Sequence, residues 1–356
     1  MSEIIVDAHL DMAYNAVVLG RDLTQPVAEI RAAERDAPSV YREEAGTCLV
    51  SVPALLAGRV AVAGGSIFVD KTSQHYPTGY HTSAEAHQRA VKQLDYYRRL
   101  ADEDARVSLV TSEDVLDDVL ATWETNDPRL GILIVMEGAD PIQEPKELSW
   151  WVERGLRGVG PTWSLGSQYA GGNAAPGGFT DAGRELLDAM AEYNLLLDLS
   201  HLWEDAVYEA LDRYPGPIVA THANPRVFVD SPRLLSDDVI RRIAQREGVV
   251  GVIPFNVMLK AGWRRNDPRL PLSSVVAAMD HVCQVVGHAR AVGIGSDFDG
   301  GFGREAVPVG LESAADLPNI GAALKERGFD AADVRAILGE NWLRVMRRTL
   351  KPYARG

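Results

Sequence analysis

The chain has 356 residues, of which 46% are hydrophobic and 24% charged, proportions typical of a globular protein. No apolar run approaches the ~20 residues of a membrane span, no secretory signal is visible, and the net charge of −14 disfavours nucleic acid and anionic membranes as partners. Only two cysteines occur, Cys48 and Cys283, so we expect buried thiols and a cytoplasmic protein without disulfides.

Short apolar runs alternate with amphipathic segments along the chain, the pattern of repeated βα units. Such runs predict buried strands at 4–6, 60–69 (in two pieces), 131–136, 156–160, 195–200, 217–221, 249–253 and 291–296. Amphipathic segments predict helices at 84–100, 145–154, 180–193, 203–212, 236–246 and 272–286.

Eight strands with intervening helices, without a repeat or a linker, favour an α/β fold of one domain over residues 1–356, a closed (β/α)8 TIM barrel. Residues 319–350, where Trp342 and Val345 stand at helical spacing, predict extra helices that pack outside the barrel.

Five of the apolar runs end on side chains that bind metals or transfer protons. In chain order, these side chains are His9 with Asp11, then Glu137, His201, His222 and Asp297. The carboxyl ends of barrel strands are where such folds carry their chemistry. Their convergence therefore predicts a metal site.

The ligand types and spacings suggest two metal ions. His9 and Asp11 are two residues apart on a strand, so their side chains project to the same face. Imidazole and carboxylate without thiolate suit Zn²⁺, with Mn²⁺, Co²⁺ or Fe²⁺ possible. No lysine ends an apolar strand, which leaves Glu137 as the best ligand to bridge a second ion. We assign His9, Asp11 and Glu137 to one ion, and Glu137, His201 and His222 to the other.

Asp297 is the candidate catalytic base, because a carboxylate facing the attacking water can take its proton and return it to the leaving group. Asp299 competes on side-chain direction, but its place beside Gly300 favours a turn-stabilising hydrogen bond. Asp7 is expected one layer deeper, behind the ligands. The other five histidines, which include His75 and His288, are expected on the surface or at helix caps.

Two loops should lie on the same face as these residues, 70–83 after the second strand and 171–178 after the fourth. A Gly-rich loop can be a simple connection, but their placement favours loops that line or cover the site.

Six motifs together resemble the renal (membrane) dipeptidase family, the dinuclear zinc peptidases of the amidohydrolase superfamily. They are Asp7-Ala8-His9-Leu10-Asp11, Met136-Glu137-Gly138, Gly158-Val159-Gly160-Pro161-Thr162-Trp163, Asp198-Leu199-Ser200-His201, Thr221-His222 and Gly295-Ser296-Asp297-Phe298-Asp299-Gly300. The resemblance implies a (β/α)8 barrel, two zinc ions bridged by the glutamate, homodimers, and hydrolysis of dipeptides, often with a D-residue at the carboxyl end.

The resemblance also implies substrate contacts. An arginine of the segment that matches 231–238 binds the terminal carboxylate, which makes Arg233 the candidate and Arg226 its competitor. Trp163 stands where mammalian members carry a histidine, and Phe255-Asn256 where they carry a tyrosine. Trp163 and Asn256 are therefore expected to face the substrate, and the preferred dipeptide is expected to differ.

The favoured interpretation is a dinuclear zinc dipeptidase whose partner is a small dipeptide. A second hypothesis is another metal-dependent hydrolase on the same scaffold, acting on an N-acyl amino acid, a lactone or a cyclic amide. A non-catalytic metal-binding protein is disfavoured, because all six ligand and base positions are present.

Overall fold

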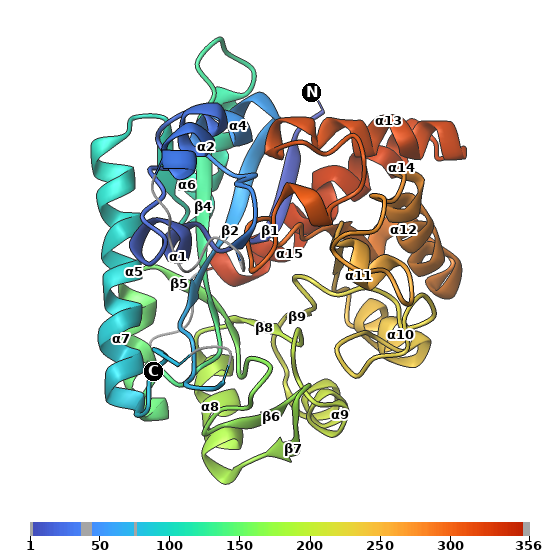
Figure 1. Cartoon of the computed structure of the whole chain (residues 1–356). Coiled ribbons are helices and arrows are strands. Elements are labelled where there is room, and N and C mark those ends of the chain that lie inside the picture. Colours follow the sequence, from blue (N-terminus) through green and yellow to red (C-terminus); the bar gives the residue numbers. More distant parts are fainter. Residues whose placement is uncertain (1–2, 37–44, 75–76, 352–356) are drawn as a thin grey trace.

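The computed structural model describes residues 3–36, 45–74 and 77–351, and its centre is a parallel sheet (Figure 1). Eight strands follow one another in the order β10-β11-β1-β2-β4-β5-β8-β9. A parallel bridge between Ala220 and Val250 joins the two ends of this order, so the sheet closes on itself. The predicted (β/α)8 barrel is confirmed.

Each barrel strand overlaps a predicted apolar run. The strands are β1 (Ile5–Leu10), β2 (Val60–Phe68), β4 (Leu130–Glu137), β5 (Leu156–Gly160), β8 (Leu196–Asp198), β9 (Ile218–Val219), β10 (Val250–Val252) and β11 (Val292–Ile294). Every residue of β1, β2 and β4 is buried, because helices cover one face of the sheet and the barrel interior the other. The two pieces predicted within 60–69 form one strand.

The predicted helices surround the sheet, with α5 and α7 on one side and α10 and α12 on the other (Figure 1). They are α5 (Ser83–Glu103), α7 (Leu148–Glu153), α8 (Asp181–Glu192), α9 (Glu204–Arg213), α10 (Asp237–Gln245) and α12 (Ser273–Val286). Thr82, Thr180 and Ser236 cap α5, α8 and α10 by accepting hydrogen bonds from backbone N–H groups of the first turns, which fixes where these helices begin.

Several elements were not predicted. They are α1 (Met12–Val17), α2 (Val27–Asp36), α4 (Val52–Ala57), β3 (Val107–Leu109), α6 (Glu113–Thr122), α11 (Asn256–Leu259) and the hairpin of β6 (Ala170–Gly172) and β7 (Ala175–Phe179). Short 3-10 turns occur at Pro145–Glu147, Ala289–Ala291, Arg304–Ala306 and Ala314–Asp316. Strand β3 pairs with β4 outside the barrel order.

The carboxyl-terminal helices are α13 (Pro318–Arg327), α14 (Ala331–Arg335) and α15 (Asn341–Leu350), with a π-helical segment at Ala336–Glu340. Helices are thus present in the predicted segment 319–350, and α15 packs against one end of the barrel. Its Trp342, Val345 and Met346 share an apolar cluster with strand residues such as Val6 and Leu133.

The hydrogen bonds of α15 show which end of the barrel it covers. Thr349 Oγ1 donates to Arg157 O at the start of β5, and Asn341 Nδ2 donates to Val292 O at the start of β11. Arg344 also donates to Arg290 O and Glu247 O, just before β11 and β10. The last helix therefore closes the amino-terminal end of the barrel, opposite to the strand ends that carry the predicted ligands.

Two general predictions can be checked against the described residues. Cys48 and Cys283 are both free thiols, the first buried and the second half-buried. Among the helices of the described segments, none combines the length and the hydropathy of a membrane span.

Candidate metal centre

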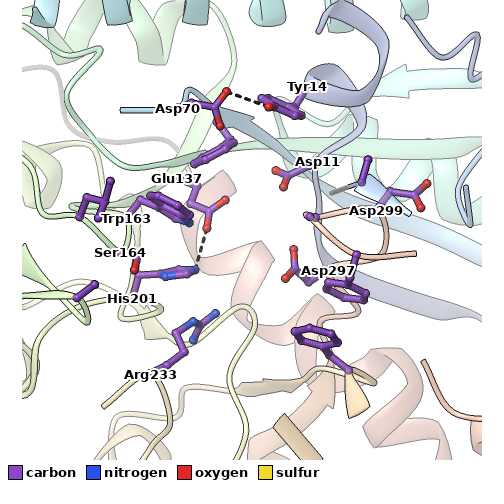
Figure 2. Close-up of a pocket in the computed structure, with 18 of the residues that line it drawn as sticks. Asp11, Tyr14, Asp70, Glu137, Trp163, Ser164, His201, Arg233, Asp297 and Asp299 are labelled. Carbon is purple, nitrogen blue, oxygen red and sulfur yellow. Dashed lines mark hydrogen bonds and ion pairs between the residues drawn. The ribbon is translucent and has the colours of Figure 1, made fainter. Parts of the chain in front are cut away.

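A cavity of about 590 Å³ opens at the carboxyl ends of the barrel strands (Figure 2). Its wall includes Asp11, Glu137, His201, Arg233 and Asp297, five of the residues predicted from sequence. Both predicted loops contribute to it, 70–83 through residues 70 and 73, and 171–178 through residue 174. Residues 75 and 76, and with them His75, lie outside the described part of the chain.

The first predicted ligand group comes from β1 and the end of β4. His9 Nε2 lies 3.2 Å from Glu137 Oε2 and 3.8 Å from Asp11 Oδ1. Ser66 of β2 donates a hydrogen bond to Asp11 Oδ1, which fixes that carboxylate. His9 is fully buried and Asp11 nearly so.

The second group meets the other oxygen of the same glutamate. His201 Nε2 lies 3.0 Å and His222 Nε2 3.3 Å from Glu137 Oε1, and the two Nε2 atoms lie 3.1 Å apart. Each oxygen of Glu137 thus faces a different set of nitrogen ligands, the arrangement that a bridging carboxylate requires.

The outer nitrogens of two histidines share one partner. Thr221 Oγ1 donates its only proton to Asp198 Oδ2 and lies 3.3 Å from His9 Nδ1 and 2.8 Å from His222 Nδ1. Both Nδ1 atoms must therefore carry protons and donate to Thr221. In the neutral rings that bind a metal, the lone pairs of His9 and His222 are therefore on the Nε2 atoms, which face the cluster.

The close approach of Thr221 depends on glycine. A Cβ at Gly295 of the β11 end would lie 1.7 Å from Thr221 O, and one at Gly251 of β10 would lie 1.9 Å from it. The backbone of Thr221 can approach β10 and β11 this closely only because both positions lack side chains. The close approach brings the next residue, His222, to the metal ligands.

Asn173, in the turn of the β6–β7 hairpin, is a site residue that the sequence reading missed. Its Oδ1 accepts a hydrogen bond from His201 Nδ1 at 2.9 Å, and its backbone N–H donates to His201 O at 2.9 Å. His201 has φ 67°, a left-handed backbone that needs such external support. The only signal in the sequence was an asparagine at the centre of a Gly-rich loop.

Loss of the Asn173 contact should weaken metal binding. We expect Asn173→Ala to lower zinc affinity by about 10- to 100-fold, because His201 loses the partner that orients its ring. Competition titration against a zinc chelator measures this. Asn173→Asp keeps an acceptor oxygen and should retain most of the affinity, whereas unchanged affinity in Asn173→Ala would contradict the role.

The charges of the cluster also fit a cation. Burial opposes protonation of His9, but the carboxylates of Glu137, Asp11 and Asp297 outweigh it and raise the pKa of His9 to about 10. Burial and Arg233 lower the pKa of His201 to about 4, and burial and His9 hold that of His222 well below its usual range. Without metal, a proton on His9 partly neutralises the negative charge of these carboxylates. A divalent ion carries more positive charge and would neutralise them more fully.

Asp297 lies across the centre from His201 (Figure 2). One of its oxygens lies within 4.8 Å of ligand atoms of both His9 and Asp11. Burial, with Asp11 and Glu137 nearby, raises the pKa of Asp297 well above its ordinary value, so its carboxylate is a stronger base than an exposed one. A Cβ at Gly300 would lie 2.0 Å from Asp297 Oδ1, so glycine leaves room for this side chain.

Two neighbouring aspartates have structural roles instead, because their carboxylates accept hydrogen bonds from backbone N–H groups. Asp7 is fully buried and accepts hydrogen bonds from Ser296 N (2.8 Å) and Ser296 Oγ, behind the ligands as predicted. The turn-stabilising role predicted for Asp299 is wrong. Its carboxylate accepts hydrogen bonds from the N–H groups of Leu49 (2.8 Å) and Val50 (2.9 Å), and so anchors a distant segment.

Arg233 is 8% exposed, and Nη2 donates to His222 O at 2.7 Å. Its Nε and Nη1 are buried without a hydrogen-bond partner in the described residues. The competitor Arg226 is engaged elsewhere, because its Nε donates to Leu234 O (3.0 Å) and Nη1 pairs with Glu204 (3.0 Å).

The other two predicted substrate residues differ in placement. Trp163 lines the cavity, with its ring 5.2 Å from that of Phe68 and 5.9 Å from that of His201. Asn256 is fully buried and is not part of the cavity wall, which its neighbours Phe255 and Met258 form instead. The structure therefore does not bring Asn256 to the site as predicted.

Of the remaining histidines, His288 caps a 3-10 turn and His281 pairs with Asp237.

A parallel barrel that gathers three imidazoles and three carboxylates at the carboxyl ends of its strands defines the class of (β/α)8 metal-dependent hydrolases. The model of the membrane dipeptidase family, peptidase family M19, matches residues 1–354. The chain belongs to this family of metallopeptidases.

Individual proteins show the same likeness. Dipeptidase 3 of Mus musculus is 27% identical over 268 residues, 73% of this chain and 51% of the mouse protein, so the chain spans about half of that relative. A Klebsiella pneumoniae protein described as an uncharacterized protein in the pqqA 5' region is 32% identical over 230 residues, 62% of this chain and 83% of that protein. A metallopeptidase of Rhodobacter sphaeroides, solved with a phosphinate mimic of L-Ala-D-Ala, has the same fold, with a TM-score of 0.80 at 23% identity over 97% of this chain and 99% of that chain.

Proposed function

We propose that the protein is a dinuclear zinc dipeptidase that hydrolyses the peptide bond of dipeptides. The observation that carries the proposal is the Glu137 carboxylate, whose two oxygens face two separate ligand sets. His9 and Asp11 would hold one ion with Glu137, and His201 and His222 the other. Bound ions would supply a water that is acidic enough to attack near neutral pH and a Lewis acid for the scissile carbonyl.

Asp297 is the residue to move the proton. Its carboxylate lies beside both His9 and Asp11 and lines the cavity, so it can accept a proton from the attacking water. The same carboxyl group then returns the proton to the departing amine. The raised pKa of Asp297 favours the first transfer, and its position on the cavity wall beside the ligands allows the second.

Arg233 supports a substrate with a free carboxylate. Its Nε and Nη1 are buried without a partner in the described residues, so the guanidinium keeps N–H donors from which a substrate carboxylate could accept hydrogen bonds. A peptide whose terminal carboxylate is held here, next to the metal ligands, presents its last peptide bond to the centre. This limits hydrolysis to very short peptides.

The function is tested by incubating the zinc-loaded protein with a panel of L,L and L,D dipeptides and with a lactone, a cyclic amide and N-acyl amino acids. We expect hydrolysis of at least one dipeptide, its loss on chelation and its return with zinc. Turnover of the lactone or the cyclic amide without any dipeptide would instead favour the other hydrolase hypothesis.

Replacing Arg233 separates these possibilities further. We expect Arg233→Met to raise KM for a dipeptide by about 10- to 100-fold, since charge-assisted hydrogen bonds are lost, with little change for the corresponding dipeptide amide. Steady-state kinetics on both substrates measure the effect. Arg226→Met is the matched control and should leave KM unchanged; equal effects of Arg233→Met on both substrates would contradict carboxylate binding.

Three further properties stay predictions on the same basis. Tolerance for a D-residue at the carboxyl end is tested by the L,D arm of the panel. A homodimer is tested by light scattering after size-exclusion chromatography, and a cytoplasmic location by fractionation of the native host.

A further inference from the structure

The cavity holds an aspartate that the proposed chemistry leaves unused. Asp70 lies two residues after the end of β2, lines the cavity and is half-buried. Tyr14 Oη donates a hydrogen bond to Asp70 Oδ2 at 2.9 Å. Asp70 belongs to neither of the ligand groups found around His9. It is thus a carboxylate presented to the cavity but not assigned to a metal.

Backbone contacts hold Asp70 in place. Tyr80 N donates to Asp70 O at 2.8 Å and Thr72 N donates to Tyr80 O at 3.1 Å, around a bridge between Lys71 and Tyr80. The adjacent cation does not turn towards Asp70, because Lys71 Nζ lies 4.0 Å from Asp140 and donates to Gly166 O at 3.1 Å. The position of Asp70 is therefore fixed by the fold of its loop.

The charged groups of the cavity stand in a definite order. Figure 2 shows Asp70 and Tyr14 at one end and Arg233 at the other, with Glu137 and His201 between them. Phe68 continues the wall, its ring 5.4 Å from that of Tyr14 and 5.2 Å from that of Trp163. A dipeptide carries its charges in the same order, with a carboxylate, then the scissile peptide group, then an ammonium.

We propose that Asp70, oriented by Tyr14, binds an ammonium group of the substrate at the end of the cavity opposite to Arg233. The inference rests on the proposed dipeptidase function and deepens it. The order of the charged groups along the cavity favours the α-ammonium of the first substrate residue as the group that Asp70 binds. The ammonium of a lysine side chain has the same charge and the same N–H donors. A carboxylate oxygen that accepts one hydrogen bond from a tyrosine can accept a second from an N–H donor.

The test compares wild type with Asp70→Asn on three zinc-dependent substrates: Ala-Ala, N-acetyl-Ala-Ala, and N-acetyl-Lys-Ala, each in the stereochemistry that the wild type accepts. We expect wild type to prefer Ala-Ala over its acetylated form, and Asp70→Asn to lose about 10- to 100-fold in kcat/KM on Ala-Ala, mainly through KM, with little loss on N-acetyl-Ala-Ala. Loss confined to N-acetyl-Lys-Ala would assign the ammonium to a side chain. Equal changes on all three substrates, or none, would overturn the proposal.

The pH profile gives a readout that a structural defect would not produce. A peptide α-amine loses its proton near pH ~8, so wild-type KM for Ala-Ala should rise above that pH, and this rise should be absent in Asp70→Asn. Tyr14→Phe, which removes the orienting hydroxyl, should shift KM in the same direction by a smaller factor. Asp188→Asn, an exposed surface position, is the matched control.

If the wild type hydrolyses no dipeptide, the proposed function fails and Asp70 is tested by calorimetric binding. Tighter binding of Ala-Ala than of N-acetyl-Ala-Ala to zinc-loaded wild type, abolished by Asp70→Asn, would still support the ammonium site. Equal binding of the two ligands, or none, would overturn it.

Discussion

Asp297→Asn is expected to lower kcat for the best dipeptide by about 100- to 10,000-fold, the range that a general base contributes. The amide keeps the shape of the side chain but cannot accept the proton of the attacking water. His9, Asp11, Glu137, His201 and His222 are unchanged, so metal content should remain that of the wild type. Kinetics and elemental analysis of the same preparation measure both quantities.

A second variant reaches the same carboxylate without replacing it. Gly300→Ala would place a methyl carbon 2.0 Å from Asp297 Oδ1, so this oxygen must move. We expect kcat to fall while the metals stay bound. Full activity of Asp297→Asn would refute the role of Asp297 as proton acceptor. Loss of metal from Asp297→Asn would indicate that Asp297 is a metal ligand instead.

Glu137→Gln is expected to remove activity together with the metals. An amide offers one oxygen and an NH2 group, so it cannot face the nitrogen ligands on both sides with a lone pair. Since even partners outside the ligand set contribute about 10- to 100-fold to metal affinity, loss of the shared ligand should cost at least that much. Zinc titration with chromophoric chelators measures the loss.

The same substitution has a thermal signature. A ligand that binds only the folded state raises its stability, so zinc should raise the Tm of the wild type and raise that of Glu137→Gln much less. Glu144→Gln, at an exposed position that pairs with Lys146, is the matched control and should respond to zinc as the wild type does. Retention of both metals in Glu137→Gln would contradict the bridging arrangement.

The strand ends could be predicted from sequence because each is a local pattern. An apolar run such as 132–136 predicts a buried strand, and its last residue, Glu137, then falls at the active edge of a parallel barrel. The same reasoning placed His9, His201 and His222 around one centre, where the structure brings them together.

Contacts between distant segments could not be predicted in this way. Asp299 binds the N–H groups of Leu49 and Val50, about 250 residues earlier, and no local pattern records that pairing. Asn173 lies in a hairpin so rich in glycine that neither strand has an apolar signal. Asn256 was expected at the site only from the resemblance, and the structure buries it and brings its neighbour Phe255 to the cavity wall.

The helix at the opposite end of the barrel has a consequence for biosynthesis. All predicted metal ligands precede residue 223, and Asp297 completes the site, yet α15 covers the apolar interior only when residues 341–350 are present. A nascent chain that carries every ligand but still holds residues 341–350 inside the ribosome would have a barrel open to water at one end. We therefore expect metal capture to follow the emergence of α15, which pulse-labelled chains stalled at different lengths would reveal.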